Sequence, residues 1–300
     1  MHQPAYHQPV MAGRVVEGLA VRPGGAYIDC TLGDAGHATA ILEAAAPSGR
    51  LLGIDADPEA TAAARDRLAP YGAAVTVVDG NFRALESLAA AHGFVPADGV
   101  LFDLGISSRQ LDAEERGFSF RRPGPLDMRF TPGEGPTAAD LVNTLDESEL
   151  ADLIYRFGEE PRSRRIARAI VAARPIDDAA KLADVVRRGS GYARGRTHPA
   201  TRTFQALRIA VNDEMDSLEA GLEQAPRVLG PGGRLVVIAY HSLEDRRVKR
   251  FMNAGPMHPL SKKVTKPSAD EIEANRRSRS ARLRVAERPL RVAEHPEHQP

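Results

Sequence analysis

Four short apolar segments in the first third of the chain each end in an aspartate, and this repeat is the strongest constraint on the fold. The acids are Asp29, Asp55, Asp79 and Asp103, with helix-like segments between them. Strand-length apolar runs that alternate with helical segments predict a parallel, doubly wound α/β sheet. In such a sheet the four carboxylates lie at the carboxyl edge, where ligands bind. If these carboxylates had only a structural role, nothing would offset their negative charge. We therefore predict a binding site at this edge.

The loop after the first apolar segment has the features of a nucleotide-binding turn. Residues 27–37 read Tyr-Ile-Asp-Cys-Thr-Leu-Gly-Asp-Ala-Gly-His, which predicts a strand, a tight turn and the start of a helix. Glycine allows positive φ and a close approach of the backbone to a ligand. The helix that follows offers unpaired N–H groups. One strand-helix-strand unit later, Asp55 is suited to bind both hydroxyls of a ribose.

A missing glycine narrows the kind of nucleotide. Gly33 and Gly36 do not form G-x-G-x-x-G, in which the third glycine packs the helix beneath a pyrophosphate. A cofactor with adenosine and no phosphate, S-adenosylmethionine, fits better. Asp29, Asp34 and the loop amides are candidates to bind its ammonium and carboxylate groups. Phe82 is a candidate to stack on the adenine, and a place in the core is an equal alternative for this side chain.

Composition limits the compartment and the partners. The chain has 40 basic and 40 acidic side chains, so binding to nucleic acid or membrane requires a local patch. An apolar fraction of 42% is enough for a sizeable core. Cys30 is the only cysteine, which excludes a disulfide framework and a cysteine-rich zinc site. No run resembles a signal peptide or a membrane span, so we expect a cytoplasmic protein.

The pattern changes near Asp112, where helical segments and a proline-broken loop replace the strands. We therefore predict an all-helical insertion in the α/β core. The predicted parts are a first core segment at 1–111, a helical substrate-recognition insertion at 112–202, a second core segment at 203–290 and a disordered tail at 291–300. Residues 201–222 predict one long amphipathic helix. Arginine-rich segments at 162–168 and 187–196 suit phosphate contacts, with a solvated helix face as the alternative.

Other classes of protein are less consistent with the sequence. His241 and Ser242 near Asp245 are contiguous and lack a G-x-S-x-G elbow, which argues against a hydrolase. An NAD-dependent oxidoreductase would need the missing glycine. A non-catalytic RNA-binding assembly factor would use the arginines but not the acids. A DNA amine methyltransferase is chemically the nearest alternative.

A final strand at 280–287 carries arginines on one side, which are further candidates for phosphate contacts.

Six longer motifs resemble those of one enzyme family. They are Asp-Cys-Thr-Leu-Gly-Asp-Ala-Gly-His at 29–37, Leu-Phe-Asp-Leu-Gly-Ile-Ser-Ser at 101–108, Glu-Arg-Gly-Phe-Ser-Phe at 115–120, Gly-Pro-Leu-Asp-Met-Arg at 124–129, His-Pro-Ala-Thr-Arg-Thr-Phe-Gln-Ala-Leu-Arg at 198–208 and His-Ser-Leu-Glu-Asp at 241–245. In this order they resemble the RsmH (MraW) family, S-adenosylmethionine-dependent methyltransferases of the bacterial small-subunit ribosomal RNA.

The resemblance implies an activity, a cofactor and a partner. The activity is methylation of N4 of cytidine 1402 in the decoding centre of 16S rRNA, within the small ribosomal subunit. The implied fold is a Rossmann-like methyltransferase core with a helical insertion. The implied contacts to S-adenosylmethionine are Gly33, Ala35, Gly36, His37, Asp55, Phe82, Asp103 and Gln110. Arginine-lined loops favour the assembled subunit over naked RNA as substrate. Monomer and homodimer both stay open.

Methylation of an exocyclic amine assigns a hypothetical catalytic role to Asp103. The lone pair of the cytosine amine is delocalised into the ring, so catalysis depends on acceptors that orient the amine. Asp103 is our candidate acceptor, and holding the cofactor is its alternative role. DNA amine methyltransferases carry Asn/Asp-Pro-Pro-Tyr/Phe at this place, and the sequence Asp-Leu-Gly at 103–105 lacks the aromatic residue. We therefore expect Phe118 or Phe120 to clamp the base.

Overall fold

The computed structural model describes residues 9–121, 123–191 and 198–290, which divide into two compact units. Unit 1 comprises residues 9–55, 59–105 and 218–290, and unit 2 comprises residues 56–58 and 106–217. The predicted disordered tail at 291–300 lies outside the described residues, as do Arg194 and Arg196 of the second arginine-rich segment. That the helical part recognises a substrate stays a prediction.

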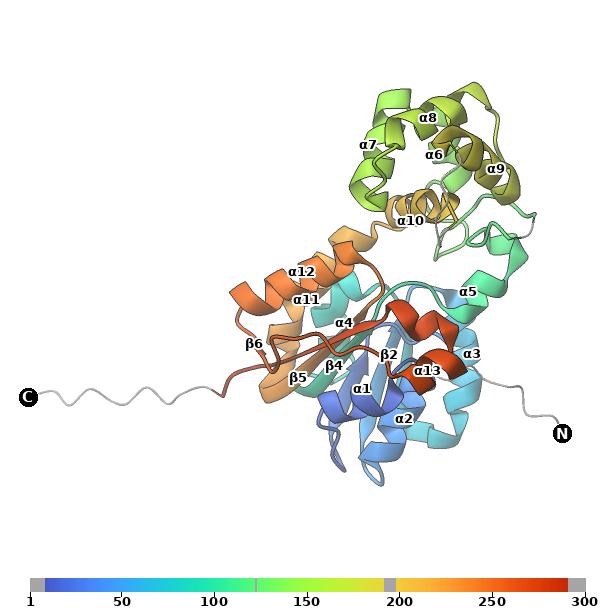
Figure 1. The fold of residues 1–300 in the computed structure, drawn as a ribbon. Coiled ribbons are helices and arrows are strands. Elements are labelled where there is room, and N and C mark those ends of the chain that lie inside the picture. The colour runs from blue at the N-terminus through green and yellow to red at the C-terminus, as the bar shows by residue number, and fades with distance from the viewer. Residues whose placement is uncertain (1–8, 122, 192–197, 291–300) are drawn as a thin grey trace, which may run out of the picture. The chain divides into compact units, whose positions relative to one another are not determined.

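Unit 1 is built on a seven-stranded sheet (Figure 1). Its strands are β1 (Ala26–Asp29), β2 (Arg50–Asp55), β3 (Val75–Asp79), β4 (Ala97–Asp103), β5 (Leu229–Ala239), β6 (His258–Pro259) and β7 (Arg282–Glu287). Their order is β3-β2-β1-β4-β5-β7-β6. The first five are parallel, whereas β7 pairs antiparallel with β5 and β6. The predicted Rossmann-like α/β class is confirmed.

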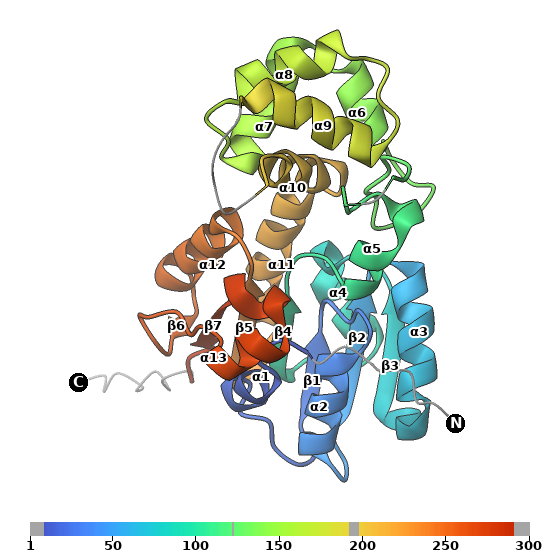
Figure 2. The same cartoon turned by 45° about the vertical axis from the view of Figure 1, so that its right-hand side comes forward.

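Helices cover both faces of this sheet (Figure 2). The elements are α1 (Ala12–Gly18), α2 (Gly36–Ala45), α3 (Pro58–Leu68), η1 (Ala69–Ala74), η2 (Phe82–Ala84), α4 (Leu85–Ala91), α11 (Glu214–Val228), α12 (Ser242–Ala254), α13 (Ala269–Ala274) and η4 (Arg276–Ser280). Side chains of β1 alternate, so Ile28 packs with α4, α11 and α12 and Tyr27 packs with α1, α2 and α3. A sheet buried on both faces explains why its strands read as unbroken apolar runs.

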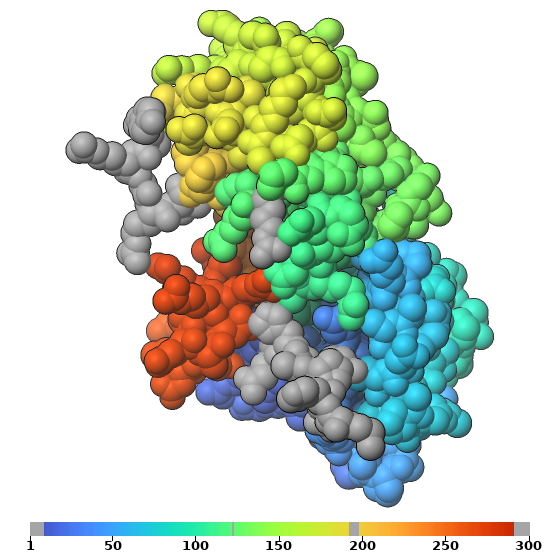
Figure 3. All heavy atoms as spheres, turned by 90° about the vertical axis from the view of Figure 1, so that its right-hand side faces the viewer, coloured from blue at the N-terminus to red at the C-terminus, as the bar shows by residue number. Residues whose placement is uncertain are grey.

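Helix α3 shows how a surface helix of unit 1 is patterned. Its Ala60, Ala64 and Leu68 are buried, one helical turn apart, while Arg65 and Asp66 are exposed. The exposed side faces the viewer in Figure 3, where it is light blue. In the described part of the chain, no helix is both long and apolar enough to cross a membrane.

Unit 2 is helical and has its own apolar core. Its elements are α5 (Ser108–Asp112), η3 (Glu114–Arg116), α6 (Ala138–Thr144), α7 (Glu147–Gly158), α8 (Ser163–Ala172), α9 (Ala179–Ser190) and α10 (Ala200–Val211). Ile154, Ile166 and Leu182 from three of these helices are fully buried in that core. Capping boxes at Thr137 and Asp146 start α6 and α7, because each side chain accepts a backbone N–H that the helix leaves unpaired.

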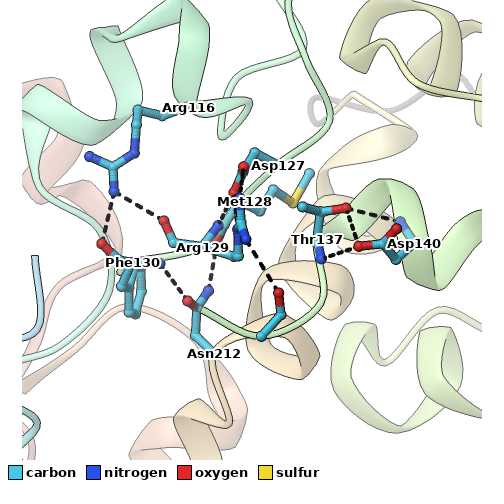
Figure 4. Close-up of polar contacts among 9 residues, drawn as sticks. Arg116, Asp127, Met128, Arg129, Phe130, Thr137, Asp140 and Asn212 are labelled. Atoms are coloured by element: carbon cyan, nitrogen blue, oxygen red, sulfur yellow. Dashed lines mark hydrogen bonds and ion pairs between the residues drawn. The ribbon is translucent and has the colours of Figure 1, made fainter. Parts of the chain in front are cut away.

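The prediction of one helix over 201–222 is wrong. Helix α10 ends at Val211, α11 begins at Glu214, and Asp213 between them has φ 48°. Asn212 is the physical cause, because its side chain accepts from the backbone N–H of Phe130 at 2.6 Å and donates to the carbonyl of Met128 at 2.7 Å (Figure 4). These long-range hydrogen bonds hold the chain in a turn, which the amphipathic pattern does not reveal.

The irregular segment that contains Met128 and Phe130 is held by side chains rather than by secondary structure. The buried Arg116 guanidinium donates to the carbonyls of Arg129 at 3.0 Å and Phe130 at 2.9 Å (Figure 4). Arg129 in turn forms an ion pair with Asp127 at 2.7 Å. Charge-assisted bonds of this kind fix a proline-broken loop that has no ladder of its own.

Gly53 in the middle of β2 has no space for a side chain, and this predicts the effect of an alanine. A Cβ there would lie 2.6 and 2.7 Å from the two methyl groups of the buried Leu32. We expect Gly53→Ala to lower the free energy of unfolding by about 1–3 kcal/mol because of overpacking.

The matched control is Gly13→Ala in α1, where a Cβ meets nothing within 4 Å. There we expect a gain of about 0.5–1 kcal/mol, because alanine loses less backbone entropy than glycine in a helix. Urea unfolding followed by circular dichroism measures both changes. Equal midpoints for the two variants would contradict the overpacking argument.

Candidate functional site

The four predicted aspartates do end four adjacent strands at one edge of the sheet. Asp29 ends β1, Asp55 ends β2, Asp79 ends β3 and Asp103 ends β4. Asp79 lies on the outermost of these strands, is exposed, and binds the hydroxyl of Thr61 and the guanidinium of Arg65. Its charge is therefore already compensated, and the other three carboxylates form the candidate site.

Asp29 is a carboxylate buried without full compensation. Its side chain is completely inaccessible, and Oδ1 accepts from the backbone N–H of Thr31 at 3.1 Å. Oδ2 is buried and has no hydrogen-bond partner among the described residues. Burial raises the pKa of Asp29 to about 6, against a smaller opposing effect of His37. Such an orphaned acceptor is suited to a ligand that brings a donor or a positive charge.

Asp103 is held on both sides by side chains from distant parts of unit 1. The hydroxyl of Tyr240, at the end of β5, donates to Oδ1 at 2.8 Å. Nε2 of His37, in the first turn of α2, lies 3.3 Å from Oδ2. The backbone N–H of Asp103 donates to the hydroxyl of Thr31 at 2.7 Å, which connects Asp103 to the turn that also binds Asp29. These contacts fix the orientation of the Asp103 carboxylate.

His37 and Tyr240 titrate differently from exposed residues of their kind. Burial alone would lower the pKa of His37, but the nearby Asp103 and Asp29 carboxylates outweigh it, and the pKa is raised. Burial, and then the charge of Asp103, raise the pKa of Tyr240 well above its usual value. Tyr240 therefore stays a neutral hydrogen-bond donor. Nδ1 of His37 is buried and has no hydrogen-bond partner in the described residues.

The turn between β1 and α2 has the conformation that the sequence predicts. Gly33 and Ala35 have φ of 49° and 59°, and the N–H of Gly33 donates to Oδ2 of Asp55 at 2.7 Å. At Gly36, the first residue of α2, a Cβ would lie 3.1 to 3.3 Å from the ring of Pro9. Ala35 is fully buried. A non-glycine residue at positive φ costs about 1 kcal/mol, which is typical of functional turns.

Phe82 begins η2 and lies at the margin of the core. Its ring meets Phe102 edge-on, with centroids 5.3 Å apart and planes at 83°. The side chain is partly buried against the same core cluster. Phe82 therefore lies partly in the core, the alternative that the sequence left open, and the residue stays partly accessible.

Gln110 belongs to unit 2, unlike the other seven predicted contacts. It caps α5 through a reciprocal bond with Ser107, and its Nε2 donates to Oδ2 of the fully buried Asp57 at 2.8 Å. Arg116 forms an ion pair with the same Asp57 oxygen at 2.9 Å. In this structure the amide of Gln110 thus holds the short segment that follows Asp55 in the chain.

The sequence did not single out Thr31, Tyr240 or Asp57. Tyr240 directly follows the fifth parallel strand, so a rule that considers all polar side chains at strand ends, and not acids alone, would have found it. Asp57 follows Asp55 by two residues, but only the structure shows that it is buried with Arg116. In the last strand, Arg282 and Arg284 share the single carboxylate of Asp245, at 3.3 and 2.7 Å. That this strand contacts phosphate stays a prediction.

Unit 1 therefore offers a sheet edge whose chemistry suits a cationic nucleoside. The carboxylates of Asp29 and Asp103 act on the imidazole of His37, and Asp55 ends the neighbouring strand. Oδ2 of Asp29 and Nδ1 of His37 are buried and lack partners in the described chain. S-adenosylmethionine carries ammonium and sulfonium charges, a ribose diol and no phosphate, so these residues fit it. A pyrophosphate would meet carboxylates instead of the expected donors.

Comparison with known proteins identifies close relatives. A family model described as the MraW methylase family matches residues 4–289. A protein named "Ribosomal RNA small subunit methyltransferase H" from Dehalococcoides mccartyi is 51% identical over 96% of this chain and 88% of its own length. One of the same name from Thermomicrobium roseum is 53% identical over 94% and 93%. Among solved structures, a putative rRNA methylase from Clostridium thermocellum matches with TM-score 0.45 and 14% identity, over 94% of this chain and 99% of that one.

The raised pKa of Asp29 predicts how stability depends on pH. Because its pKa rises from 3.8 to about 6 on folding, the folded state holds the proton more tightly, and stability falls as pH rises between those values. The variant Asp29→Asn has no ionisable group at this position, so its stability does not fall with pH in this way. We expect the variant to match the wild type near pH 4 and to exceed its free energy of unfolding by roughly 2–3 kcal/mol at pH 7.

Urea unfolding at several pH values between 4 and 7 measures this difference. The matched control is Asp66→Asn, which changes an exposed carboxylate on α3 and should keep a constant difference from the wild type over the range. A difference between Asp29→Asn and the wild type that does not grow with pH would show that burial of Asp29 carries no such cost.

Proposed function

Because the chain belongs to the MraW methylase family, we propose that it transfers a methyl group from S-adenosylmethionine to N4 of cytidine 1402 in 16S rRNA. The observation that carries the proposal is the cluster of strand-end acids in unit 1, in which the buried Asp29 keeps one oxygen without a partner among the described residues. Relatives about 50% identical to this chain are named as methyltransferases of the small-subunit rRNA. The partner is then the small ribosomal subunit, and the compartment is the cytoplasm.

The cofactor roles follow from the chemistry of each group. Asp55 binds the ribose hydroxyls, the backbone of 33–37 lines the amino-acid part, and Phe82 packs against the adenine. Asp29 attracts the positive charge of the cofactor through its orphaned oxygen. When bound, S-adenosylmethionine supplies an electrophilic methyl group. Gln110 acts from unit 2 by holding Asp57, two residues after Asp55.

Asp103 orients the amine of the target cytosine in this proposal. Tyr240 and His37 each engage one of its oxygens, yet a carboxylate oxygen accepts at about two sites, so acceptor capacity remains. An amine hydrogen held there turns the nitrogen lone pair away from the ring system and toward the methyl group. Because Asp103 is already fixed by its neighbours, little reorganisation accompanies the reaction.

Methyl transfer to an identified nucleoside tests the proposed function. Purified protein is incubated with labelled S-adenosylmethionine and small subunits that lack the modification, and the digested RNA is analysed by mass spectrometry. We expect N4-methylcytidine at position 1402 alone. In a parallel incubation with DNA, label in the DNA and none in the RNA would identify a DNA amine methyltransferase. RNA binding that does not depend on the cofactor, together with no methyl transfer, would identify an assembly factor.

The variant Asp103→Asn separates the two roles of this residue. Asparagine keeps an acceptor for Tyr240 but loses the charge, so we expect the rate of transfer to fall by about 10²–10³. We expect the dissociation constant of S-adenosylmethionine, measured by calorimetry, to change less than about threefold. If cofactor affinity fell as far as turnover, Asp103 would hold the cofactor and would not be the catalytic acceptor.

A further inference from the structure

An exposed histidine in unit 2 is held in one orientation by two contacts. Nδ1 of His198 accepts from the backbone N–H of Ala200 at 3.2 Å, at the start of α10. The imidazole also stacks on Phe120, with centroids 4.7 Å apart and planes at 27°. An exposed side chain normally exchanges among rotamers, so a ring fixed in this way is already ordered for a second stacking partner.

Phe120 is itself supported from the core of unit 2. The buried Phe204 meets its ring edge-on, with centroids 4.9 Å apart and planes at 69°. The three rings therefore form a stack that begins in the core at Phe204 and ends at the surface with His198. We call Phe120 and His198 the aromatic platform.

Phe118, the other predicted base clamp, is excluded by its surroundings. Its side chain is only 6% exposed and stacks on Phe130, with centroids 5.8 Å apart. The guanidinium of Arg116 lies 5.8 Å from its ring centroid. Phe118 is therefore a core residue, and of the two expected clamps only Phe120 reaches an accessible stack.

Positive charge accompanies the platform. Arg121 follows Phe120 directly, is exposed, and has no acidic partner in the part of the chain that the structure describes. Arg202, in the first turn of α10, is 53% exposed and lies 3.6 Å from Glu160. A base is always linked to a phosphate, so an aromatic surface beside an uncompensated arginine matches a single-stranded nucleic acid.

We propose that the aromatic platform stacks an unpaired base of the RNA substrate, with Arg121 contacting an adjacent phosphate. The proposal rests on the proposed function, because it takes ribosomal RNA as the ligand of unit 2. Every base has a π face, so the platform supplies affinity and position without reading sequence. Stacking on an aromatic side chain strengthens binding about ten- to a hundredfold per base.

Two substitutions of His198 separate stacking from helix capping. His198→Asn keeps an acceptor in the place of Nδ1 and removes the ring, whereas His198→Tyr keeps a ring and removes that acceptor. We expect His198→Asn to raise the KM for small subunits about ten- to a hundredfold. We expect kcat and the affinity for S-adenosylmethionine to stay within about threefold, and His198→Tyr to stay near the wild type in all three.

The control variant is Tyr155→Ala, which removes an exposed aromatic ring on α7 that takes part in no ring stack among the described residues. Its KM should equal that of the wild type. A wild-type KM for His198→Asn would overturn the platform, and so would a loss in His198→Tyr as large as in His198→Asn. Circular dichroism and thermal unfolding establish that each variant is folded.

A second measurement keeps this test separate from that of the methylation activity. Direct binding of a short single-stranded RNA, followed by fluorescence anisotropy, needs no transfer. If the wild type transfers no methyl group but His198→Asn weakens RNA binding and His198→Tyr restores it, the platform stands and the proposed function fails. If both His198 variants bind this RNA like the wild type, the platform is overturned whatever the enzyme methylates.

Discussion

The structure depends on one electrostatic constraint, the negative charge that a parallel sheet gathers at the carboxyl edge of unit 1. Asp29 is completely buried there, and its raised pKa indicates that ionisation opposes folding at neutral pH. The Asp103 carboxylate is oriented by Tyr240, and both acids act on the single imidazole of His37. Apolar residues of similar size at these positions would favour folding more, so the cost is best explained by a positively charged ligand that the acids bind.

The fold class could be predicted because its determinants are local. Apolar runs of strand length, each followed by a turn and a helix, leave few arrangements other than a parallel sheet covered on both faces. The break between α10 and α11 could not be predicted in the same way. The apolar pattern continues through it, and the stop comes from Asn212, whose hydrogen bonds reach the backbone of Met128 and Phe130 more than eighty residues away in sequence.

The same distinction separates the predictable from the unpredictable part of the site. Asp29, Asp55 and Asp103 follow from strand ends, but only the structure shows that Tyr240 contacts Asp103, 137 residues away. The arginines show most clearly what cannot be predicted from sequence. A sequence does not reveal which of them already have an acid partner, so Arg284 suggested a phosphate contact although it binds Asp245. Arg121 lies in an irregular loop where no sequence pattern distinguishes it, and it has no such partner among the described residues.

The segment 56–58 connects the strand that carries the proposed ribose contact to the unit that carries the aromatic platform. Residues 56–58 leave the end of β2 directly after Asp55, yet they belong to unit 2. There Asp57 is bound by Gln110 and Arg116, and the carbonyl of Ala56 accepts from the hydroxyl of Thr131 at 2.8 Å. The backbone that follows the proposed ribose contact is therefore fixed by side chains of the unit that carries the aromatic platform. Gln110 thus holds the segment that follows the proposed ribose contact, Asp55, through its bond to Asp57.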